Sequence, residues 1–280
     1  MEKWVDLHLH TNHSDGSDAP SRVVERAAAL GMSALAVTDH DTVSALTEAQ
    51  EAARALGVEL LPGVELSTMY GYIEIHIVGL GIDYQDPVLL EALNELHEAR
   101  SKRVDAILER LNALGVDLTR AEVEAQASGG EAATLGRMHV AMALHAKGIT
   151  RTVQQGFDRY IRRGRKAYIP KRAMTCRKAI DLIHEAKGLA FLAHPGVGTT
   201  LGKLILRLIN ELPFDGVEVY HSKHTSGRAT QFLQIAQEHN LLVSGGSDCH
   251  GTATHPTPDM GKVRLPYRFY EAILQRLSPK

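Results

Sequence analysis

The sequence has little cysteine, few aromatic residues and no long apolar run. Its 280 residues include only two cysteines, which excludes a framework of disulfides and a cage of thiolate metal ligands. No segment approaches the roughly 18 apolar residues that a membrane-spanning helix needs. The first residues, Met1 to Trp4, lack the charged-then-apolar layout of a secretory signal. We therefore expect a cytoplasmic protein that does not span a membrane.

A strong charge of either sign is also missing. The formal net charge is -2, which argues against bulk attraction to nucleic acid, although a local basic patch could still bind phosphates. Aromatic residues make up 5% of the chain and offer few platforms for stacking on bases. The sequence is instead rich in histidine, with fifteen, and its 44% of hydrophobic residues suffices for a large core.

The segment 6–16 combines histidines with carboxylates, which suit a cation: it reads Asp-Leu-His-Leu-His-Thr-Asn-His-Ser-Asp-Gly. Its alternation predicts a strand, so His8 and His10 point to the same side. Two neighbouring imidazoles followed by Asp15 are a common beginning of a divalent cation site. A buried pair of neutral imidazoles would otherwise need partners for four ring nitrogens. A metal site is therefore the preferred interpretation.

Strands and helices alternate along most of the chain. Apolar runs at 34–37, 58–65, 189–193, 216–220 and 241–244 predict buried strands, with amphipathic helices between them. Residues 72–79 alternate strictly, which predicts a strand with His76 on its polar face. With the opening segment the count is seven strands. Polar residues at the strand ends indicate an α/β fold, a parallel barrel or sheet with its site at that edge.

From about residue 86 the apolar period changes to 3.6, which predicts a long helix through Leu114. Thr119 and Glu122 have the spacing of a capping box. Further helices are expected at 42–56, before this segment, and at 134–147 and 152–161 within it. We predict a helical insertion domain over 86–172, which covers the substrate, and a barrel domain formed by 1–85 and 173–280.

Nine candidate metal ligands fall at or just beyond the ends of separate strands. Lone histidines and carboxylates are usually structural or surface residues, but so many ionisable groups at one edge would be costly to bury without cations. His221 and His224 also follow a strand end, and we expect them to be structural or surface residues. The nine candidates are His8, His10, Asp15, His40, Glu65, His76, His194, Asp248 and His250.

These residues, in segments such as Ser14-Asp15-Gly16, Thr38-Asp39-His40-Asp41 and Ser247-Asp248-Cys249-His250, resemble the PHP (polymerase and histidinol phosphatase) family over nearly the whole chain. The resemblance implies a distorted (β/α)7 barrel with a trinuclear metal site. It implies that one ion is held by His8, His10, Glu65 and Asp248, a second by Glu65, His76 and His194, and a third by Asp15, His40 and His250. Imidazoles mixed with carboxylates suit Mn2+, Fe2+ or Zn2+ better than Mg2+ alone, and we expect two to three ions, with Mn2+ first.

The likeness is closer to the PHP branch that contains 3',5'-nucleoside bisphosphate phosphatases and a 5'-3' exoribonuclease, on segment 74–83 and on the insertion. It implies a metal-dependent phosphomonoesterase that removes the 3'-phosphate of nucleoside 3',5'-bisphosphates. Guanidinium groups suit phosphate because they donate forked hydrogen bonds. The implied substrate-binding residues are His40, Arg100, Arg103, Arg137, His139, His194 and His250.

Three other functions stay open. A 5'-3' exoribonuclease acting on short RNA is favoured by eight basic residues between Arg151 and Arg172, where Asp158 is the only acid, although such a run is also typical of a solvated face. An amidohydrolase fits the His-x-His pattern, but no lysine stands at a strand end to bridge two metals. A non-catalytic metal-binding module is the third. The sequence leaves the oligomeric state open.

Overall fold

The computed structural model describes residues 3–127, 135–170, 174–197, 202–251 and 259–278. Within them, one sheet has the strand order β8-β7-β6-β4-β3-β2-β1-β9, and β5 pairs with β3. The strands are β1 (Trp4–Leu9), β2 (Ala34–Val37), β3 (Glu59–Tyr70), β4 (Ile73–Leu80), β5 (Met174–Thr175), β6 (Leu189–Leu192), β7 (Gly216–His221), β8 (Leu242–Gly246) and β9 (Leu265–Pro266).

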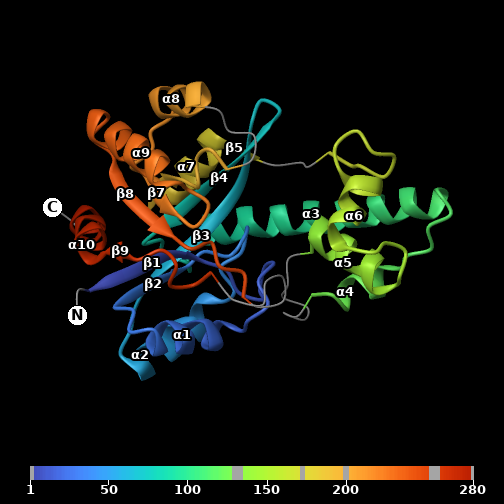
Figure 1. The fold of residues 1–280 in the computed structure, drawn as a ribbon, viewed down its shortest axis with the longest axis horizontal. Coiled ribbons are helices and arrows are strands. Elements are labelled where there is room, and N and C mark those ends of the chain that lie inside the picture. Colours follow the sequence, from blue (N-terminus) through green and yellow to red (C-terminus); the bar gives the residue numbers. More distant parts are fainter. Residues whose placement is uncertain (1–2, 128–134, 171–173, 198–201, 252–258, 279–280) are drawn as a thin grey trace.

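The sheet curls into a barrel that is nearly closed (Figure 1). Strands β1 and β8 meet through an isolated parallel bridge between Leu9 and Cys249, beyond the end of β8. The amide of Asp248 donates to the carbonyl of His8 at 3.0 Å beside this bridge. The predicted α/β class is confirmed, and the closure places the ends of β1 and β8 side by side.

Helices cover the outside of the barrel because its strands are buried on both faces, as β1, β2 and β6 are throughout. In Figure 1, α1 and α2 lie on one side, α7, α8 and α9 on the other, and α10 at the end where β1 begins. The hydroxyl of Tyr267 fixes α10 by donating to Glu59, the first residue of β3, at 2.6 Å. These helices are α1 (Pro20–Ala29), α2 (Leu46–Leu56), α7 (Cys176–Glu185), α8 (Gly202–Glu211), α9 (Ser226–Glu238) and α10 (Tyr267–Leu277).

The expectation of wholly parallel strands is wrong at β4. Strand β3 does not end at Glu65 but continues to Tyr70, turns at Gly71 with φ +60°, and pairs antiparallel with β4. Strand β4 is also antiparallel to β6. His76 therefore lies within its strand, opposite Ser67, and the reversal of chain direction brings it to the same edge as Glu65.

Smaller differences lie outside the seven predicted strands. Helix α2 begins at Leu46 rather than at residue 42, because Asp41 has a left-handed backbone with φ 52° and turns follow it. Strands β5 and β9 have two residues each, too few for a periodic signal. Helix α10 was missed although its apolar residues Tyr270, Ile273, Leu274 and Leu277 have helical spacing. The capping box of Thr119 and Glu122 is confirmed, while Thr134, the predicted start of a helix, lies outside the described residues.

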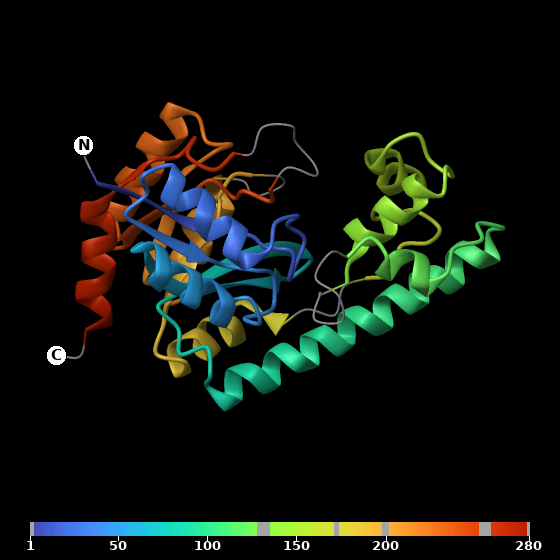
Figure 2. The same ribbon diagram turned by 90° about the horizontal axis from the view of Figure 1, so that it is seen from below.

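The segment after β4 is helical, as predicted, and Figure 2 shows α3 reaching from the barrel to the shorter helices. Leu89 and Leu93 of α3 belong to the apolar core under the barrel, whereas Ile107 and Leu111 belong to a second core with α5. The division of the chain at residues 86 and 172 stays a prediction. The helices are α3 (Pro87–Ala113), α4 (Arg120–Glu124), α5 (Arg137–Ala146), α6 (Val153–Gly156) and the π-helix η2 (Phe157–Ile161).

Among the helices that the structure describes, none has the length and low polarity needed to cross a membrane.

Candidate metal centre

The centre of the site is the carboxylate of Glu65 on β3, which has no exposed surface. Five imidazoles surround it, and they come from β1, β4 and the segments after β1, β2 and β6. Its Oε2 lies 3.2 Å from Nε2 of His8, 3.2 Å from Nε2 of His10 and 3.1 Å from Nδ1 of His40. Its Oε1 lies 2.9 Å from Nδ1 of His76 and 2.9 Å from Nε2 of His194. One carboxylate thus joins five of the nine candidate ligands.

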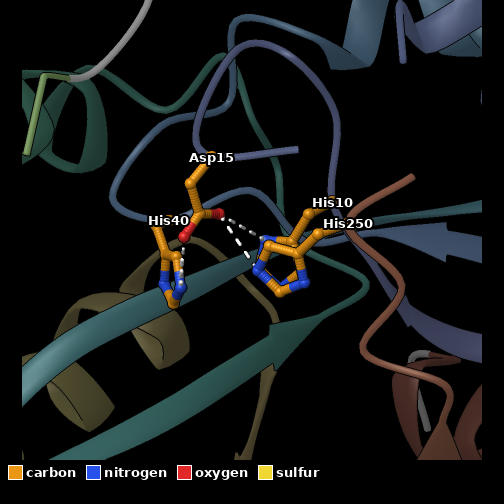
Figure 3. Close-up of side chains that lie close together, drawn as sticks. All are labelled: His10, Asp15, His40 and His250. Carbon is orange, nitrogen blue, oxygen red and sulfur yellow. Dashed lines mark ion pairs between the residues drawn. The ribbon is translucent and has the colours of Figure 1, made fainter. Parts of the chain in front are cut away.

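A second group forms around Asp15, in the loop after β1. Figure 3 shows this carboxylate between His40 on one side and the stacked rings of His10 and His250 on the other. Its Oδ1 lies 3.1 Å from Nε2 of His250 and 3.8 Å from Nδ1 of His10, and its Oδ2 lies 3.8 Å from Nε2 of His40. His10 and His40 each contact Glu65 through one ring nitrogen and Asp15 through the other, so they connect the two groups.

Asp248 completes the set from the end of β8. Its Oδ1 lies 3.3 Å from Nε2 of His10 and 3.7 Å from Nε2 of His8. Asp248 has φ 55° and His194 has φ 26°, which are left-handed conformations that residues other than glycine rarely adopt. Such strain is characteristic of functional sites. All nine residues selected from the sequence therefore lie in one connected cluster.

The donor set fits divalent cations. Ligand atoms within 4.8 Å of one another form three groups: His8, His10 and Glu65; His40, Glu65 and His76; and His10, Asp15, His40 and His250. Several of these atoms are buried without a partner in hydrogen-bond geometry, among them Nε2 of His8, both ring nitrogens of His10 and Oε2 of Glu65. Because an unsatisfied buried polar atom is costly, cations bound between them would remove the penalty.

The charges of the cluster also favour cations. Burial acts to raise the pKa of the Glu65 carboxyl, but the imidazoles of His40, His8 and His76 outweigh it and hold this pKa well below its ordinary value. Burial lowers the pKa of His40 to about 3. Metal ligation requires deprotonated carboxyls and neutral imidazoles, and Glu65 and His40 are in these forms at neutral pH. Neighbouring carboxylates instead raise the pKa of His8, His10 and His250, and a divalent cation would replace the proton at these imidazoles.

A cavity of about 170 Å³ opens between the cluster and the insertion. Asp15, His40 and His76 line it on the barrel side. All four insertion residues predicted to bind substrate line the opposite side, namely Arg100, Arg103, Arg137 and His139. The wall between them is partly apolar and includes Ile107, Leu135 and Phe157.

Two of the three cavity arginines are held by neighbouring groups. Arg100 donates to the buried carboxylate of Asp41 and, at 3.0 Å, to Oγ of Ser67. Arg103 donates to the carbonyl of Ile169 at 2.8 and 3.0 Å, and burial lowers its pKa to about 10, which still leaves it charged. These contacts fix the guanidinium groups before a substrate arrives.

His139 is 5% exposed, and its Nδ1 accepts from the amide of Gly136 at 3.1 Å, at the beginning of α5. Its proton therefore lies on Nε2. His139 can donate one hydrogen bond while it remains neutral.

Several residues that contact the cluster were not predicted. Asp39 fixes the opening loop by accepting from the amide of Thr11 at 2.8 Å and from the hydroxyls of Thr11 and Ser14. His221, expected to be structural or on the surface, is buried with its Nε2 3.3 Å from Oδ2 of Asp248. Glu218 contacts His8. Its only sequence signal is a charged residue in the apolar run Gly216–His221.

Comparison with known proteins decides the family. The profile described as "PHP domain" matches residues 6–96. Over 250 residues the chain is 38% identical to the 5'-3' exoribonuclease Rnm of Escherichia coli (strain K12). The alignment covers 88% of this chain and 84% of that protein. The chain belongs to the PHP family. It is a metal-dependent phosphoesterase.

Two further relatives match this chain over nearly its whole length. The 3',5'-nucleoside bisphosphate phosphatase of Chromobacterium violaceum is 34% identical over 286 residues, with 97% of this chain and 98% of that protein covered. A crystal structure from Bifidobacterium adolescentis, described as a metal-dependent phosphoesterase, superimposes with a TM-score of 0.88 at 31% identity and covers 98% of this chain and 96% of that one. The distorted barrel and its insertion are therefore shared with PHP proteins.

Proposed function

We propose that this PHP phosphoesterase removes the 3'-phosphate of nucleoside 3',5'-bisphosphates and leaves the 5'-monophosphate. One observation carries the proposal: three arginines and a histidine of the insertion face His40 and His76 of the metal cluster across a single cavity. Such a cavity suits a small substrate with two phosphates, because one can lie at the cluster while the arginines bind the other. The bisphosphate phosphatase among the relatives supports the same substrate.

We assign two to three divalent ions to the cluster, with Mn2+ as the first candidate. His8, His10, Glu65 and Asp248 would hold one ion, Glu65, His76 and His194 a second, and Asp15, His40 and His250 a third. Divalent ions held there supply Lewis acidity toward phosphate oxygens and activate water near neutral pH.

The chain's own residues bind and orient the ester. Arg100 and Arg103 are three residues apart on one face of α3, while Arg137 and His139 stand in the first turn of α5, whose amides also favour an anion. Guanidinium groups placed there neutralise charge that spreads over the phosphoryl oxygens in the transition state. His40 lines the cavity, and we assign it to the reacting phosphate together with His194 and His250, which belong to the metal cluster but do not line the cavity. Ile107 and Phe157 add apolar surface to the wall of the cavity.

The test is phosphate release from adenosine 3',5'-bisphosphate in the presence of Mn2+. We expect Glu65→Ala to lose at least about 1000-fold in kcat/KM, because several kcal/mol of transition-state stabilisation depends on the cluster. Arg137→Ala should lose about 10- to 100-fold, as expected for one phosphate contact. Arg54→Ala, an exposed position on α2, is the matched control. Activity that is unchanged in both site variants would refute the assignment.

The second candidate function is 5'-3' exonuclease activity on short RNA. Directly after η2, whose Phe157 lines the cavity, comes the exposed segment 162–166 with four basic residues. Among the described residues, Arg162 pairs with Asp158 at 3.1 Å, whereas no ion pair joins Arg163, Arg165 or Lys166 to an acid. A single strand that leaves the cavity along this segment would gain phosphate contacts. The exoribonuclease among the relatives supports this candidate.

The two candidates are separated by a triple variant in which Arg163, Arg165 and Lys166 become Glu. If RNA is the substrate, cleavage of 5'-phosphorylated oligoribonucleotides should fall about tenfold or more and depend less steeply on salt, because phosphate contacts are lost. Hydrolysis of adenosine 3',5'-bisphosphate should stay at the wild-type rate. Equal rates on RNA for the variant and the wild type would contradict a role for this segment.

A further inference from the structure

Strand β7 supplies none of the nine candidate ligands, yet it carries a buried carboxylate between two of them. Glu218 is 2% exposed. Its Oε1 lies 3.1 Å from Nδ1 of His8, and its Oε2 accepts the backbone N–H of His194 at 2.6 Å. Both oxygens are therefore used, and the two partners belong to different strands and to different ions of the proposed centre.

The contact with His8 selects one form of the imidazole. An ionised carboxylate only accepts hydrogen bonds, so Nδ1 of His8 carries the proton in this contact. The other nitrogen, Nε2, lies 3.2 Å from Oε2 of Glu65 and 3.7 Å from Oδ1 of Asp248, so it is the nitrogen that would turn its lone pair to a cation bound between these atoms. A cation between these atoms needs that lone pair. With the proton on Nε2 instead, His8 could not ligate from its present position.

The contact with His194 acts on the backbone. His194 has φ 26°, in the left-handed region that a side chain disfavours, so its conformation must be held by surrounding contacts. Glu218 accepts its amide hydrogen, and the turn that follows closes with the amide of Val197 donating to the carbonyl of His194 at 3.1 Å. In this conformation the ring of His194 places Nε2 2.9 Å from Oε1 of Glu65.

We propose that Glu218 is a positioning residue that sets the ring tautomer of His8 and the backbone of His194, and so couples the affinities of two cation subsites. The inference rests on the metal assignment made in the proposed function. Outer carboxylates that accept from a ligating imidazole typically change metal affinity 10- to 100-fold when they are replaced. Glu218 serves two ligands at once, so one substitution should weaken both subsites.

Glu218→Gln is the decisive variant because it keeps the size of the side chain. One end of the amide can still accept from the amide of His194, but its NH₂ group then faces Nδ1 of His8 and favours the tautomer with the proton on Nε2. Glu218→Asp keeps the charge but is one methylene shorter, so it cannot reach both partners.

A matched control stands at the other end of β7. Asp215, just before the strand, accepts from Nε2 of His184 at 2.7 Å and from the amide of Ala190 at 2.8 Å. Like Glu218, Asp215 contacts one imidazole and one backbone amide, but neither belongs to a candidate metal ligand. Asp215→Asn should therefore bind Mn2+ with wild-type affinity.

The experiment titrates the full metal-free chain with Mn2+ and follows free Mn2+ by electron paramagnetic resonance, with no substrate present. We expect Glu218→Gln to weaken the ions at His8 and His194 about 10- to 100-fold. The ion at Asp15, His40 and His250 should be affected least. With the diamagnetic ion Zn2+ in place of Mn2+, nitrogen-15 NMR of the imidazoles should show the proton of His8 on Nδ1 in the wild type and on Nε2 in Glu218→Gln.

Wild-type Mn2+ affinity in Glu218→Gln, or an unchanged His8 tautomer, would overturn the proposal. So would an equal loss at all subsites, since that is the result of a removed charge alone. If Glu218→Gln does not fold, Glu218→Asp decides, because it should keep the Nδ1 proton and still weaken Mn2+ binding about 3- to 10-fold. Binding is measured without a nucleotide, so failure on adenosine 3',5'-bisphosphate would reject the proposed substrate and leave this result intact.

Discussion

The barrel edge and the insertion contribute to one cavity in different ways. On the barrel edge, the functional groups are histidines and carboxylates at strand ends, packed around a carboxylate with no exposed surface. On the insertion they are arginines on helices, held by a carboxylate, a hydroxyl and a backbone carbonyl. A rigid sheet edge suits ions that need fixed ligand geometry, whereas long side chains on helices suit recognition of phosphates. We therefore expect changes at the edge to remove catalysis, and changes in the insertion to alter the choice of substrate.

The largest effect should come from His10, which contacts both Glu65 and Asp15. His10→Ala should lower kcat by at least about 1000-fold, because the ion assigned to His8, His10, Glu65 and Asp248 loses a ligand and Asp15 of the neighbouring subsite loses a contact. The number of bound ions, measured by mass spectrometry of the metals in purified protein, should fall together with the rate. His184→Ala, at an exposed position on α7, should keep full activity and metal content. A His10→Ala protein that retains its ions would contradict the shared role.

Removal of the metals should lower the stability of the barrel, which holds the metal cluster, more than that of the insertion. Each ion present at about 100 times its dissociation constant stabilises the fold by about 2.7 kcal/mol, if it binds only the folded chain. We expect chelation to lower the melting temperature of the barrel and to abolish phosphate release, and added Mn2+ to restore both. Differential scanning calorimetry measures the first effect. A melting temperature that does not respond to chelation would mean that the cluster folds equally well without ions.

A substitution of Arg100 tests whether the insertion binds the substrate without affecting the metals. Arg100→Ala should raise KM for the bisphosphate about 10- to 100-fold, because a charged contact to phosphate is lost, while Mn2+ affinity stays unchanged. Arg110→Ala is its control, since Arg110 donates to the carbonyl of Tyr168 and does not line the cavity. Steady-state kinetics and the Mn2+ titration together decide. A loss of Mn2+ binding in Arg100→Ala would place this arginine in the structure of the metal centre.

A substitution in the second apolar core, around α3 and α5, should have the smallest effect on the metal cluster. Leu111 is completely buried there, and Leu111→Ala should destabilise the insertion by about 2–5 kcal/mol. If residues 86–172 form a separate domain, two unfolding transitions should appear, and only the one independent of Mn2+ should shift. Hydrogen exchange can locate that transition. A single transition, shifted as a whole, would show that the barrel and the insertion unfold together.

Much of the centre could be predicted because its signals are local. His8 and His10 stand in an alternating run, and His40 and His194 directly follow apolar runs, so periodicity alone brings them to one edge. The reversal of β4 could not be predicted, because an alternating strand has the same pattern whether its neighbour runs parallel or antiparallel. Glu218 was missed because its partner His8 is 210 residues away in the sequence. The tautomer that it imposes depends on that distant pairing.

Helix α3 passes from one apolar core into the other. Its packing in the first core ends at Leu96 and its packing in the second begins at Val104, and Arg100 and Arg103 occupy the stretch between them. Polar contacts hold this stretch in place of apolar packing, because Arg100 donates to Asp41 and Ser67 and Arg103 donates to Ile169. The two guanidinium groups thus sit on the stretch of α3 that lies between the two cores and belongs to neither.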